Sequence, residues 1–125
     1  MIKRLLKTLA LIGLLTASLA APLRADPPVI EEVKAHRVGM GWRIDVTLSH
    51  PDTGWDHYAD GWEVLDSKGK KLAFRKLLHP HVDEQPFTRS LINVMLPDGI
   101  QEIQIRARCS VDGWASEPVK VKLRN

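Results

Sequence analysis

Two histidines, an aspartate and the only cysteine carry most of the chemistry that this sequence can offer. His50 and His57 lie in one short segment rich in aspartate and aromatic residues, and Cys109 and Asp112 lie in a second segment much further along the chain. Imidazole and thiolate are ligands that suit iron, zinc and copper. If the fold brings the two segments together, they form a transition-metal site. From the residues alone, iron, copper and zinc are all candidates.

A second pair of histidines, His79 and His81, can complete this ligand set. Pro80 favours an extended conformation for His79, and residues i and i+2 of an extended chain project to the same side. The two imidazoles can therefore converge on one ion together with, or in place of, Asp112. The alternative interpretation is a solvated loop that happens to carry two histidines.

Each of the three principal ligands also has a plain structural interpretation. Cys109 continues an alternating apolar series that ends a strand, so it can be a buried core thiol that packs as a small hydrophobe. His50 can simply open a turn before Pro51. His57 lies in an aromatic loop that can be an exposed contact surface, a use that suits tyrosine and tryptophan.

The elements that must position these residues are predicted to be β-strands. Apolar and polar residues alternate with period two from Trp42 to Ser49, and similar short patterns recur between turn residues along the chain. The predicted strands cover residues 29–38, 42–49, 61–65, 71–78, 87–96, 103–109 and 119–123. Seven short strands indicate an all-β domain, an immunoglobulin-like (fibronectin III-like) seven-stranded antiparallel β-sandwich. A small antiparallel barrel is the alternative.

The parity of the strands predicts where the histidines lie. If successive strands reverse direction, the loops after the second, fourth and sixth strands fall at the same end of the sandwich. These loops carry four of the five histidines and the cysteine, whereas His36 lies near the opposite end. The topology is therefore expected to gather the candidate ligands at one pole.

Residues 1–25 are predicted to be a secretory signal peptide. Three basic residues precede an apolar stretch, 9–15, and small residues lead to a cleavage site after Ala25. The apolar stretch is shorter than the roughly 20 residues of a membrane span. We therefore expect a periplasmic or secreted protein with no membrane anchor after cleavage, and a single β-sandwich domain over residues 26–125.

The charge balance depends on this leader. The leader holds four of the 18 basic side chains and none of the 15 acidic ones, so residues 26–125 carry 14 basic and 15 acidic side chains, a net charge of −1. This balance gives no reason to expect nucleic-acid binding.

Several ordered motifs resemble the ferrous-iron domain of superoxide reductase, also called desulfoferrodoxin or neelaredoxin. They are P-V-I-E at 28–31, H-P at 50–51, H-Y at 57–58 with W-E at 62–63, and C-x-x-x-G at 109–113. The resemblance implies an immunoglobulin-like sandwich that holds iron at one end through four histidines and a cysteine. It also implies an oxidoreductase whose open sixth iron position meets superoxide and whose iron is re-reduced by an electron donor.

The resemblance carries over residue by residue for three of the five ligands. His50, His57 and Cys109 match two histidines and the cysteine of the family. Asp112 stands where the family has a histidine, and Asp26 is the nearest candidate for another. The alternative function is a non-enzymatic periplasmic adaptor that has lost the iron site and binds an unknown protein partner through its aromatic loops.

Overall fold

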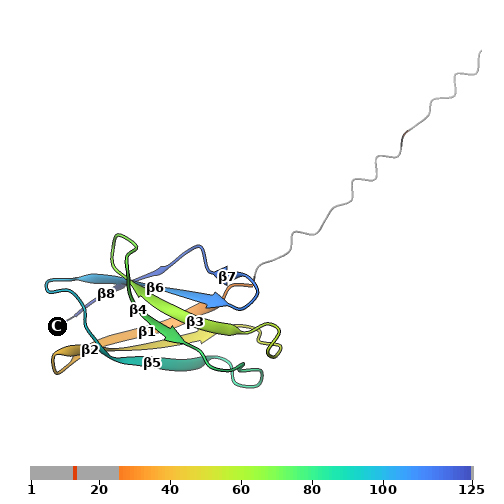
Figure 1. Ribbon diagram of the computed structural model, residues 1–125, viewed down its shortest axis with the longest axis horizontal. Coiled ribbons are helices and arrows are strands. Elements are labelled where there is room, and N and C mark those ends of the chain that lie inside the picture. Colours follow the sequence, from red (N-terminus) through yellow and green to blue (C-terminus); the bar gives the residue numbers. More distant parts are fainter. Residues whose placement is uncertain (1–12, 14–25, 125) are drawn as a thin grey trace, which may run out of the picture.

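The computed structural model describes Gly13 and residues 26–124, and the latter form two antiparallel β-sheets. The predicted signal peptide, apart from Gly13, lies outside the described residues. One sheet has the strand order β1-β2-β5, and the other has the order β4-β3-β6, with β7 and β8 both paired to β6 (Figure 1). The strands are β1 Val29–Val38, β2 Gly41–Ser49, β3 Ala59–Leu65, β4 Lys71–Lys76, β5 Phe87–Val94, β6 Glu102–Cys109, β7 Gly113–Trp114 and β8 Val119–Lys122. None of the described residues forms a helix with the length and hydropathy that crossing a bilayer requires.

The alternation of apolar side chains in β2 and β6 explains how the two sheets pack. Along each strand, every second residue is buried and its neighbours are more exposed. The buried side chains from Trp42 to Leu48 in β2 and from Ile103 to Ala107 in β6, with Trp62 from β3, belong to one hydrophobic cluster between the sheets. The protein is therefore an antiparallel β-sandwich, as the sequence predicts. The central members of the cluster are Ile44, Val46, Leu48, Trp62, Val64, Ile103 and Ile105, all fully buried.

Two predicted strands end earlier than expected. Strand β4 ends at Lys76 because Leu77 turns into the core, where its amide donates to the carbonyl of Asp60 at 3.0 Å. Strand β5 ends one residue after Asn93, whose φ of 55° departs from the extended conformation.

The segment 110–116 was predicted to be a loop, and this is wrong for two of its residues. Gly113 and Trp114 form β7, which pairs with the end of β6 at Cys109 and Arg108. A positive φ of 73° at Gly113 lets the chain reverse directly after Asp112. The reversal keeps this loop short and close to the end of β6.

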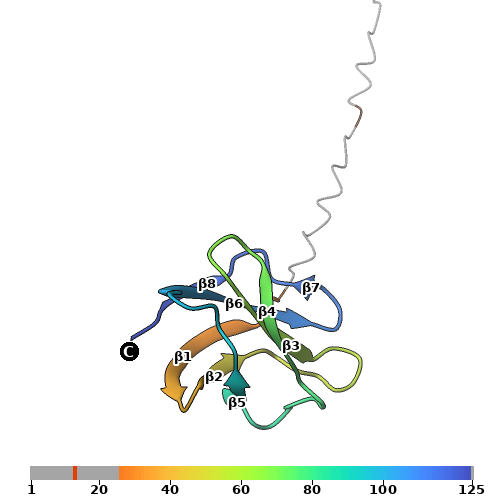
Figure 2. The same cartoon turned by 60° about the vertical axis from the view of Figure 1, so that its left-hand side comes forward.

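The loops after β2, β4 and β6 gather at one end of the sandwich, as the strand parity predicts (Figures 1 and 2). The amide of Ser110 donates to the carbonyl of Tyr58 at 2.9 Å, and the amide of His50 donates to Gln85 Oε1 at 3.0 Å. We call this end the loop pole and define it as residues 26–28, 50–58, 77–86 and 110–112. His36 lies outside it, on β1, opposite Arg43 of β2.

Candidate metal centre

Three of the predicted ligands meet at the loop pole. One ligand atom each from His50, His57 and Cys109 lies within 4.8 Å of the other two. The side chains of His50 and Cys109 are buried, and that of His57 is 26% exposed. Both Nε2 atoms are buried, and within residues 26–124 neither has a hydrogen-bond partner. Buried polar atoms almost always have a hydrogen-bond partner. Two neighbouring Nε2 atoms that lack one therefore mark these three side chains as a candidate set of metal ligands.

A tight turn in the loop after β2 brings His57 back to His50. The amide of Thr53 donates to the carbonyl of His57 at 3.0 Å, and the amide of His57 donates to the carbonyl of Gly54 at 3.2 Å. Gly54 has a φ of 141°, which a residue with a side chain rarely adopts. The two imidazoles consequently meet edge to face, with ring centroids 4.8 Å apart.

Asp52 orients His50, a role that the sequence analysis missed. This buried carboxylate accepts hydrogen bonds from His50 Nδ1 at 2.5 Å, from the Ala59 amide at 2.9 Å and from the His81 amide at 2.8 Å. Since an ionised carboxylate can only accept, Nδ1 of His50 carries the proton and Nε2 keeps a free lone pair. A carboxylate behind a ligating imidazole is a common arrangement in metal sites. The one signal in the sequence was the spacing H-P-D.

Asp112 borders the same group from the other side. Its amide donates to Cys109 Sγ at 3.3 Å, and its Oδ2 lies 3.6 Å from that sulfur and 3.9 Å from His57 Nε2. Cys109 is fully buried among the core residues, at the edge of the hydrophobic cluster that joins the sheets. Its sulfur also contacts the amide and the carboxylate of Asp112.

The donor set fits a divalent transition-metal ion. In a tetrahedral site, bonds of about 2.0–2.3 Å place donor atoms roughly 3.3–3.8 Å apart. All three ligand atoms of the group lie within 4.8 Å of one another, so the side chains need to approach by at most about 1.5 Å, a movement that rotation about χ angles supplies. Two neutral imidazoles, a thiolate and the nearby carboxylate of Asp112 together balance the charge of such an ion.

His79 and His81 lie beside this group and do not belong to it. The ring of His81 stacks on Phe87 with centroids 3.8 Å apart, and its Nε2 accepts a hydrogen bond from Arg89 Nη2 at 2.7 Å. Burial, assisted by the Arg89 guanidinium, lowers the pKa of His81. His79 is exposed. His81 therefore supports the centre through its backbone amide, which binds Asp52.

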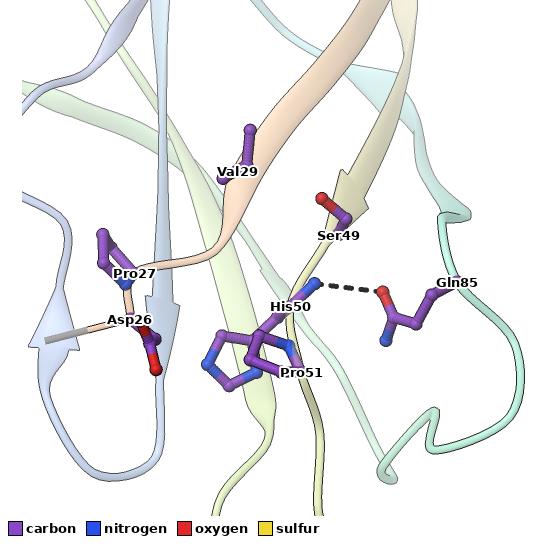
Figure 3. A pocket seen from close by; sticks show the side chains of 7 residues that line it. All are labelled: Asp26, Pro27, Val29, Ser49, His50, Pro51 and Gln85. Atoms are coloured by element: carbon purple, nitrogen blue, oxygen red, sulfur yellow. Dashed lines mark hydrogen bonds between the residues drawn. The ribbon is translucent and has the colours of Figure 1, made fainter. Parts of the chain in front are cut away.

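A shallow surface pocket of about 460 Å³ lies over His50 (Figure 3). Gln85 forms part of its wall and binds the His50 amide. Asp26, which is exposed, lines the same pocket as His50. The full lining is Asp26, Pro27, Val29, Ser49, His50, Pro51 and Gln85.

Comparisons with known proteins give one relative. A candidate lipoprotein of Halomicrobium mukohataei (strain ATCC 700874 / DSM 12286 / JCM 9738 / NCIMB 13541) is 36% identical over 83 residues. The match covers 66% of this chain and 40% of that protein, so the chain spans less than half the length of the relative. No family model matches the chain, and no solved structure matches it.

Proposed function

We propose that this protein is an exported β-sandwich that binds one transition-metal ion through His50, His57 and Cys109 in a variant of the superoxide reductase iron site. The observation that carries the proposal is the pair of buried, unpartnered Nε2 atoms facing a buried thiol. A core cysteine or a turn histidine gives no reason for this convergence from two distant loops. Iron is the first candidate for the ion.

The strand order and the relative support the remaining parts of the proposal. The sheets β1-β2-β5 and β4-β3-β6, with β8 on the far side of β6, suit an immunoglobulin-like sandwich of the fibronectin III kind. The relative from Halomicrobium mukohataei is described as a candidate lipoprotein, which suits a protein that works outside the cytoplasm.

A redox role is the chemistry that we propose for the ion. When bound, iron would supply one-electron exchange. The Cys109 thiolate donates electron density to the ion, and the Asp112 carboxylate adds a negative charge where the family has a neutral imidazole. Both groups stabilise the oxidised ion. We therefore expect this centre to be harder to re-reduce than a site with four histidines.

A cobalt titration of the purified protein tests metal binding directly. Co²⁺ should bind at one equivalent and produce a thiolate-to-metal absorption band, because Cys109 is a ligand. Cys109→Ser should abolish the band and weaken binding at least about tenfold.

His79→Ala is the control, since it removes an exposed imidazole of the same pole that lies outside the ligand group. This variant should bind cobalt like the wild type. Binding of less than about a tenth of an equivalent of metal to the folded wild type would contradict the proposal.

A further inference from the structure

The surface around the candidate metal centre exposes large apolar side chains. Trp55 is 67% exposed, Leu78 65%, Val82 53% and Val111 60%. They come from the three loops that hydrogen bonds join around His50, His57 and Cys109. The ring of Trp55 rests edge to face against Tyr58, with centroids 5.5 Å apart. Tryptophan held in this way is a frequent anchor of protein interfaces.

The same surface is strongly acidic. The loop pole contains six of the 15 acidic side chains of residues 26–125 and none of the 14 basic ones, which leaves nine acidic and 14 basic side chains, a net charge of +5, elsewhere. Among the six, only Asp52 is buried. The exposed five are Asp26, Asp56, Asp83, Glu84 and Asp112.

The cations nearest to the loop pole offset part of this charge. Arg108 is paired with Asp60 at 2.8 Å, outside the pole as defined. Arg89 binds the neutral ring of His81 at 2.7 Å and keeps its positive charge, and Lys76, at the end of β4, is exposed. With Arg89, Lys76 and the α-amino group that cleavage after Ala25 would place at Asp26 counted against the five exposed acids, this face keeps a charge of −2.

We propose that the loop pole docks a partner protein with a basic, partly apolar face. The apolar side chains supply the contact, and the acidic rim supplies complementarity and steering. Anionic lipid headgroups and a second copy of the same acidic pole would both be repelled. The bare Nε2 of His50, whose side chain has no exposed surface, lies directly beneath this face.

Docking of this kind does not depend on the proposed metal centre, because the apolar and acidic side chains are present with or without an ion. A partner seated on Trp55 and Val111 would lie next to the loops that hold His57 and Cys109, so docking and metal binding are tested separately.

Cytochrome c, a basic haem protein, serves as the probe, and its lysine-acetylated form serves as the charge control. Binding to the purified protein is measured by calorimetry at about 20 mM and about 200 mM salt. We expect binding that weakens with salt, disappears with acetylated cytochrome c and is the same for metal-free and cobalt-loaded protein. The paired substitution Asp83→Lys and Glu84→Lys, and separately Trp55→Ala, should each weaken it roughly tenfold.

Asp98→Lys is the matched control, because Asp98 is an exposed acid in a turn outside the loop pole. It should leave binding within about twofold of the wild type. Equal weakening by this control, unchanged binding in the pole variants, or no binding at low salt would overturn the proposal. Binding to anionic vesicles, or a dimer that Trp55→Ala dissociates, would overturn it in favour of a membrane or a second copy. Loss of cobalt binding with intact docking would instead refute only the metal site.

Discussion

At the scale of single residues, Asp52 fixes the orientation and the tautomer of the His50 imidazole. Its carboxylate accepts a hydrogen bond from Nδ1–H of His50 and two more from the backbone amides of Ala59 and His81. This buried arrangement fixes the orientation of one imidazole before any ion arrives. Such preorganisation raises the affinity for a metal ion, because the side chain loses less conformational entropy when the ion binds.

Asp52→Asn should weaken cobalt binding by about 10–100-fold, the usual effect of losing a carboxylate behind a ligating histidine. The side chain keeps its size, but it loses the charge that holds Nδ1–H. Asp60→Asn is the control, because Asp60 pairs with Arg108 on the neighbouring strand and does not contact His50. Competition titrations with a chromophoric chelator measure both affinities. Equal affinities in the two variants would remove Asp52 from the centre.

Single residues also show what the sequence could and could not predict. His50, His57 and Cys109 were found because their side-chain types suit a metal and because strand parity places them at one pole. The part played by Asp52 depends on amides from Ala59 and His81, which only the folded chain brings to it. The ring of His81 is engaged by Phe87 and Arg89 of β5, and no spacing rule predicts that contact.

At the scale of elements, the loop after β2 is the part that positions His57. Its turn depends on Gly54, which has a φ of 141° and open space around the position of a Cβ. A substitution at this position therefore strains the backbone without creating a clash.

Gly54→Ala should cost about 1 kcal/mol of folding free energy and also weaken cobalt binding, because strain there displaces His57. Gly69→Ala offers the comparison: it places a side chain at a φ of 84° in the turn between β3 and β4, away from the loop pole. It should cost a similar free energy and leave cobalt affinity unchanged. Urea denaturation and cobalt titration of both variants separate the effects. Unchanged cobalt affinity in Gly54→Ala would show that this turn does not position His57.

Regular elements were the most predictable part of the fold, for a physical reason. In β2 and β6 the side chains alternate between core and surface, so apolar and polar residues alternate along the sequence and reveal the strand. Strand β7 was missed because two residues are too few to show a period; the turn at Gly113 and the pairing with β6 create it. The ends of β4 and β5 likewise depend on Leu77 and Asn93, whose conformations follow from long-range packing and backbone geometry.

At the scale of the whole molecule, an ion at the proposed centre would link the two sheets. The loop with His50 and His57 connects β2 of one sheet to β3 of the other, and Cys109 ends β6 of the second sheet. An ion bound only by the folded chain stabilises it by about 2.7 kcal/mol at 100 times its Kd.

Cobalt at that concentration should therefore raise the Tm of the wild type by roughly 10–20 °C. Cys109→Ser should show little of this rise, because one of the three ligands is lost. In the metal-free state, this variant reports how strongly the thiol itself stabilises the fold. Calorimetry with and without cobalt provides both values, and an equal rise in the two proteins would exclude Cys109 as a ligand.

The separation of the ligands along the chain also has a consequence for when the ion is acquired. His50 and Cys109 come together only after β2, β3 and β6 have found their places, so an unfolded chain contains no such site. If the chain is exported before it folds, it cannot carry an ion with it from the site of synthesis. Its metal is then chosen by the supply in the compartment where folding is completed, more than by the order of intrinsic affinities.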